Sequence, residues 1–99
     1  MREARVRLVC LKAAALIKEG YVVFCPVAHA HTIAAYGGLP PMNHDLWTEQ
    51  DLAFLRLSDE LWVYCIPGWD ESKGVFAEVG EAIRLKMPIK YLDDEGDET

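Results

Sequence analysis

Three segments of the chain repeat apolar residues at the three- and four-residue spacing of an amphipathic helix. They cover residues 2–19, 45–57 and 74–86. Gly20 follows the first segment and predicts its end, because glycine readily takes the positive φ that closes many helices. The positions at helical spacing are Val6, Val9, Ala13, Leu16 and Ile17 in the first segment, and Leu46, Gln50, Phe54 and Leu57, with Leu55 nearby, in the second. In the third segment, Val75, Val79, Ala82 and Ile83 are expected to form the inward stripe.

Three shorter runs are mainly apolar, which is typical of strands buried on both faces of a parallel sheet. They are residues 21–25, 61–66 and 88–92. Proline follows the first two runs and opens the third. Residues 29–44 are predicted to form a loop, because Gly37-Gly38 and Pro40-Pro41 interrupt the pattern there.

This alternation of helices and strands predicts an α/β fold, with parallel strands joined by right-handed helical crossovers. We expect a three-layer flavodoxin- or Rossmann-like sheet with helices on both faces, built by a single domain over residues 1–92. Residues 93–99 are expected to be a solvated acidic tail. Such sheets bind ligands beyond the carboxyl ends of their strands, so functional residues are expected after Cys25, Ile66 and Leu92.

Charge and composition exclude several classes of protein. The chain of 99 residues carries ten Lys and Arg against sixteen Asp and Glu, and five of these acids lie in residues 93–98. Residues 1–92 are therefore nearly neutral, which argues against a basic face that binds nucleic acid. No apolar run approaches the ~20 residues of a membrane span. Charges between residues 3 and 18 also interrupt any signal-peptide core.

The three cysteines, Cys10, Cys25 and Cys65, form no CxxC pair, and each lies in an apolar stretch. This usage favours reduced, buried thiols in a cytoplasmic protein. A nucleophilic role stays open for Cys25 and Cys65 alone, because both lie at the ends of predicted strands.

The segment PGWDESKGVFAE, residues 67–78, follows a predicted strand and opens a predicted helix. Gly68 and Gly74 allow a tight turn, and Ser72 is placed to cap the helix. The first amides of that helix would face an anion such as a phosphate. Glu78 lies further along the same helix, and the spacing leaves open whether it faces a ligand or is a surface acid.

Two further groups of residues have a chemical and a structural interpretation. His29 and His31 form an HxH pair, which in an extended segment projects to one side and suits a metal, a ligand hydroxyl or phosphate, or a purely structural role. Trp47 and Asp51 lie four residues apart and share a helix face. Together with Trp69 they suit a nucleobase, which stacks on an aromatic ring and bonds a carboxylate. The alternative places Trp47 in the core and Asp51 in solvent.

Residues 68–74, Glu78–Ala82 and Met87–Ile89 resemble the nucleoside 2-deoxyribosyltransferase-like superfamily. The sequence is more similar to an uncharacterised bacterial and phage branch, with VFSP-x-x-H-x-H after one strand and GW-x-x-S-x-G-x-x-x-E after a later one. This chain has Val23–Pro26, His29 and His31 for the first pattern and residues 68–78 for the second. The resemblance extends over residues 5–92.

The resemblance implies a role for each matching residue. Glu78 corresponds to the carboxylate that attacks the anomeric carbon of a 2-deoxyribosyl group and expels the base. Ser72 corresponds to a residue that helps to hold a 5′-phosphate, and Asp51 to one that contacts the base or sugar. The implied substrate-binding set is Ser72, Gly74, Asp51, Trp47, Trp69, Asp70, His29 and His31.

One feature departs from the superfamily pattern, which normally opens with a strand before the first helix. This chain starts within that helix, at Met1–Ala4. We therefore expect the N-terminal strand to be missing. Either the start is truncated relative to a longer protein, or the sheet closes without this strand, or another chain supplies it. In each case the exposed sheet edges are expected to favour homo-oligomers, and catalytic power is expected to be lost.

Three functions follow as expectations. The first is cleavage or transfer at the N-glycosidic bond of a deoxynucleoside or its 5′-monophosphate, with Glu78 as nucleophile and no cofactor or metal. The second is a non-catalytic nucleotide-binding module with the same fold. The third is a metal-dependent hydrolase that uses His29 and His31.

Overall fold

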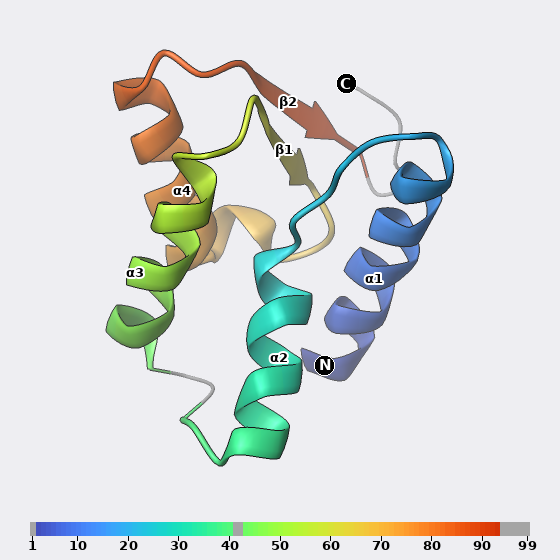
Figure 1. Cartoon of the computed structure of the whole chain (residues 1–99), viewed down its shortest axis with the longest axis vertical. Helices are drawn as coiled ribbons and strands as arrows, with labels where there is room; N and C mark the ends of the chain where they lie inside the picture. The colour runs from blue at the N-terminus through green and yellow to red at the C-terminus, as the bar shows by residue number, and fades with distance from the viewer. Residues whose placement is uncertain (1, 41–42, 94–99) are drawn as a thin grey trace. The chain divides into compact units, whose positions relative to one another are not determined.

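The computed structural model describes residues 2–40 and 43–93, so the acidic tail predicted for residues 93–99 lies almost wholly outside the described residues. The chain forms two compact units, Met1–Asn43 and His44–Thr99, each described here by itself. The described part of the first unit is helical, whereas the second combines helices with a sheet (Figure 1). The single domain expected over residues 1–92 stays a prediction. Within the described residues, every helix is too short or too polar to cross a membrane.

In the first unit, helix α1 (Arg2–Lys18) packs against helix α2 (Pro26–Gly37). The end of α1 is as predicted, because Gly20 has φ 104°. The Tyr21 N–H donates to the Leu16 carbonyl at 3.1 Å and closes the last turn. A positive φ at glycine carries no side-chain penalty, which is why the helix stops here.

The loop predicted for residues 29–44 is wrong over most of its length, because α2 occupies Pro26–Gly37. Proline is favoured in the first turn of a helix, where its missing N–H is not needed. Four alanines between residues 28 and 35 then favour the helix strongly. The glycine pair marks the end of this helix, since Gly38 takes the left-handed conformation at φ 68°.

The strand predicted at residues 21–25 is also wrong, since this segment forms no strand in the described part of the first unit. Val22 is fully exposed rather than buried between two layers. An apolar run becomes a strand only where a neighbouring strand completes its ladder of hydrogen bonds. The segment is instead an extended connection from α1 to α2, with Cys25 at φ −114° and ψ 102°.

The second unit contains the predicted strands after residue 60. Strand β1 (Leu61–Tyr64) pairs in parallel with strand β2 (Ile89–Leu92), with Leu61 opposite Ile89 and Tyr64 opposite Leu92. Helix α4 (Lys73–Arg84) connects the two strands and packs on helix α3 (His44–Leu55) (Figure 1). The fold thus mixes helices with a parallel sheet, as expected for α/β, and the sheet has two strands among the described residues.

The inward faces of α3 and α4 differ in part from the predicted stripes. Leu57 is 84% exposed because α3 ends at Leu55 and the chain turns away from the helix. Phe54 and Ile83 are exposed as well. The buried apolar residues of this unit are Trp47, Leu55, Val63, Ile66, Ala82 and Leu92.

Candidate functional site

The segment between β1 and α4 is a short, structured loop at the carboxyl end of the sheet. Gly68 takes φ 91° and leads into a single 3-10 turn, η1 (Trp69–Glu71). Ser72 then caps α4, because its Oγ accepts a hydrogen bond from the Val75 N–H at 3.2 Å. The prediction of Ser72 as a helix cap is confirmed, and its role in holding a phosphate stays a prediction.

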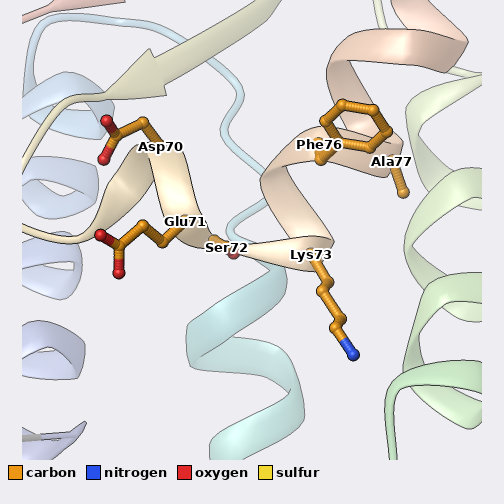
Figure 2. A pocket seen from close by; sticks show the side chains of 6 residues that line it. All are labelled: Asp70, Glu71, Ser72, Lys73, Phe76 and Ala77. Carbon is orange, nitrogen blue, oxygen red and sulfur yellow. The ribbon is translucent and has the colours of Figure 1, made fainter.

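A hollow of about 320 Å³ lies beside this loop, at the start of α4. It is lined by Asp70, Glu71, Ser72, Lys73, Phe76 and Ala77. Figure 2 shows the Asp70 and Glu71 carboxylates on one side, with Lys73 and Phe76 pointing to the other. The ring of Phe76 is largely exposed. The lining of this hollow therefore combines two carboxylates, one ammonium group, a hydroxyl and an aromatic ring, and Glu78 does not line it.

Glu78 lies on the opposite side of α4 from Phe76, since two residues advance a helix by about 200°. It is half-buried, on the face that includes Ala82, which has no exposed surface. Burial, and to a smaller extent the negative charge of Asp51, together raise the pKa of Glu78 from 4.5 to about 7. A carboxyl group with such a pKa exchanges its proton near neutral pH.

The charge that acts on Glu78 comes from Asp51 on α3, the helix that packs along α4. Asp51 is half-buried and its Oδ1 atom is buried, so it does not face solvent. Trp47, one turn earlier, is 8% exposed and belongs to the core. The structure thus brings Asp51 and Glu78 to one helix interface, next to a buried aromatic ring. The binding roles expected for Trp47 and Asp51 stay predictions.

Glu81 lies one turn beyond Glu78 and has the opposite electrostatic environment. Its carboxylate accepts hydrogen bonds from Arg84 at 2.8 and 2.9 Å and from Arg56 Nε at 2.6 Å. These bonds, first those from Arg84 and then that from Arg56, lower the pKa of Glu81 to about 2. Glu81 is therefore ionised and paired, whereas within the described residues no hydrogen bond lowers the pKa of Glu78.

Sequence reasoning missed the role of Arg56, which lies 25 residues before Glu81 in the chain. The pair with Arg84 has helical i, i+3 spacing and is visible in the sequence. The pair with Arg56 depends on how α3 and α4 pack, which periodicity does not specify.

Cys65 follows β1 and was one of two cysteines open to a nucleophilic role. Burial, together with the charges of Asp70 and Asp93, raises the pKa of the Cys65 thiol, although a backbone hydrogen bond at Leu92 opposes the shift. A raised pKa leaves little thiolate at neutral pH, so Cys65 is a weak nucleophile here.

His29 and His31 belong to the other unit, on α2. Their predicted projection to one side is wrong, because residues two apart on a helix point about 200° apart. The His29 ring packs against Phe24, with ring centroids 5.2 Å apart. Across residues 2–40 and 43–93, no three His, Cys, Asp or Glu side chains gather as a metal site would require. The metal-dependent hydrolase stays a prediction.

Comparison with known proteins gives one match. The pattern of a family described as "Domain of unknown function (DUF1937)" matches residues 1–93. The chain belongs to the DUF1937 family. No curated protein and no solved structure matches the chain. The DUF1937 match covers both units, so the residues of α2 and of the β1–α4 loop are parts of one family pattern. The resemblance to the deoxyribosyltransferase-like superfamily stays a prediction.

Proposed function

We propose that this DUF1937 chain cleaves or transfers at the N-glycosidic bond of a 2-deoxynucleoside or its 5′-monophosphate. The observation that carries the proposal is Glu78, a half-buried carboxylate that faces Asp51 across the α3–α4 interface. An acid with no structural function is normally left in water, because burying a charge is unfavourable. A buried acid with a strongly raised pKa is therefore a candidate for chemistry.

In the proposed reaction, a carboxylate oxygen of Glu78 attacks the anomeric carbon. A C–O bond forms while the C–N bond to the base breaks, and the electron pair of that bond leaves with the base nitrogen, which takes up a proton. Water or a second base then attacks the anomeric carbon and releases the Glu78 carboxylate. The two-step exchange follows the chemistry of retaining glycosidases, in which a carboxylate traps an oxocarbenium-like centre.

The remaining residues would bind the substrate. Ser72 and the first amides of α4 suit the 5′-phosphate. Asp51 suits a donor group of the sugar or base. The proposal also includes the three-layer fold. It includes self-association as well, which the exposed apolar side chains of Val22 and Phe76 favour.

The test is release of free base from a panel of deoxynucleosides and their 5′-monophosphates, followed by chromatography. Glu78→Gln keeps the shape of the side chain and removes its charge, and we expect a loss of about a thousandfold or more. Glu81→Gln is the matched control, because it makes the same change one turn away on the same helix and should keep activity. Equal activity of wild type and Glu78→Gln, or a wild type inactive on every member of the panel, would overturn the proposal.

A second candidate function is nucleotide binding without turnover. The observation that favours it is the hollow at Asp70–Ala77, which lies on the side of α4 away from Glu78. Calorimetry with deoxynucleoside 5′-monophosphates separates the two. Binding that Glu78→Gln leaves unchanged, without base release by the wild type, selects the binding module.

A further inference from the structure

An aromatic pair joins the β1–α4 loop to the neighbouring strand. The rings of Trp69 in η1 and Tyr91 in β2 have centroids 5.8 Å apart and an angle of 57° between their planes. Tilted pairs at this distance are favourable beyond the area that they bury. Both residues are half-buried. Trp69 is expected from the sequence to contact the substrate, whereas Tyr91 has no role expected from the sequence.

Tyr91 lies near the carboxyl end of the parallel ladder. It pairs with Val63, one position before the last pair of the sheet. The Cys65 N–H still donates to the Leu92 carbonyl at 2.7 Å, and the chain then leaves the sheet as the loop. The ring of Tyr91 is thus placed at the edge of the sheet where ligands of parallel sheets bind.

Backbone hydrogen bonds within the loop define its local shape. The Trp69 N–H donates to the Ile66 carbonyl, the Glu71 N–H to Gly68 and the Ser72 N–H to Trp69. All three bonds join residues three positions apart along the chain. The contact with Tyr91 differs from them, because it reaches from the loop to β2, the neighbouring strand.

We propose that Tyr91 is a positioning residue, which holds Trp69 and the β1–α4 loop in place at the sheet edge for substrate binding. This inference rests on the proposed function. Helix α4 packs on α3 and β1, so Glu78 has its own support. Loss of the Tyr91 ring should therefore disturb binding by the loop and leave the bond-breaking step nearly unchanged.

The experiment compares Tyr91→Ala, Tyr91→Phe and a control, Tyr64→Ala, which removes a half-buried tyrosine from the paired strand β1. Two quantities are measured in each variant. One is KM and kcat for base release from the deoxynucleoside 5′-monophosphate that the wild type cleaves fastest. The other is hydrogen exchange at the amides of residues 68–72, which requires no activity.

For Tyr91→Ala we expect KM to rise about fivefold to tenfold, with kcat within about twofold of wild type. Exchange in the loop should be faster. Tyr91→Phe keeps the ring and should restore both values, and Tyr64→Ala should leave KM and loop exchange near those of wild type. A tyrosine that merely supports the sheet would give the same result at both positions.

The possible failures are distinguishable. An active wild type whose KM and loop exchange are unchanged in Tyr91→Ala, or changed equally in Tyr64→Ala, overturns the role of Tyr91 and leaves the proposed function intact. A wild type that releases no base overturns the proposed function. In that case loop exchange decides alone: faster exchange in Tyr91→Ala but not in Tyr91→Phe supports the positioning role, and equal exchange in both overturns it.

Discussion

Replacement of Glu78 by glutamine should change how the stability of the second unit depends on pH. In the folded protein the pKa of Glu78 is about 7, against 4.5 for an exposed glutamate. Between these two values the folded state holds a proton that the unfolded state has released. The free energy of unfolding must therefore fall as pH rises through this window.

The magnitude follows from the two values of the pKa. Each unit of difference corresponds to about 1.4 kcal/mol, so Glu78 should lower the free energy of unfolding by about 3 kcal/mol between pH 4.5 and pH 8. The change is complete once pH exceeds the folded pKa. Glu78→Gln has no proton to lose and should lack this contribution.

The assay is urea unfolding at several pH values from 4.5 to 8, followed by tryptophan fluorescence. All three tryptophans, at positions 47, 62 and 69, lie in the second unit, so the signal reports the unit that contains Glu78. The difference in the free energy of unfolding between wild type and Glu78→Gln, taken at each pH, cancels the contributions of the other titrating groups. Parallel curves for the two proteins over this range would refute a buried Glu78 with a raised pKa.

Three further predictions use other features of the structure. Ser72→Ala removes the bond to the Val75 N–H and should lower the free energy of unfolding by about 1 kcal/mol, measured by urea unfolding; no loss would contradict the capping role. The pKa of Glu81 is about 2, below its unfolded value of 4.5, so its stabilising contribution is present above pH 4.5 and lost as pH falls toward 2. In Glu81→Gln the stability should depend less on pH in that range, measured as acid unfolding by circular dichroism, and an unchanged acid transition would contradict the arginine pairing. Because a nucleophile must be ionised, kcat/KM for base release should rise with pH through about 7, and a fall over the same range would assign Glu78 as a proton donor instead.

The elements that sequence predicted well have strong local signals. The runs at residues 61–66 and 88–92 are apolar, short and bounded by proline, and each contains a strand. The helix predicted at residues 74–86 corresponds to α4 at Lys73–Arg84, and Ser72 caps it as predicted. In these segments the local preference and the tertiary environment agree, so periodicity is sufficient.

The errors occur where a local signal has two meanings or where a partner decides the structure. A proline such as Pro26 can mark the end of a strand or the first turn of a helix, and in this structure it opens α2. Residues 21–25 have the composition of a strand, but strand formation also requires a neighbour with which to pair. The sequence left the burial of Glu78 open for the same reason, because this burial depends on how α3 packs on α4 and not on the residues next to Glu78 in the chain.

The most direct test of Glu78 as the nucleophile is the site at which the sugar becomes attached. During turnover of a deoxynucleoside 5′-monophosphate the protein is rapidly denatured and digested with trypsin, which cuts after Lys73 and Arg84. The resulting peptide, residues 74–84, contains both Glu78 and Glu81, so fragmentation in the mass spectrometer compares the two acids directly. We predict a phosphorylated deoxyribosyl ester on Glu78 in wild type and none in Glu78→Gln. Base release with the ester on Glu81 or Asp51, or undiminished release by Glu78→Gln, would contradict it.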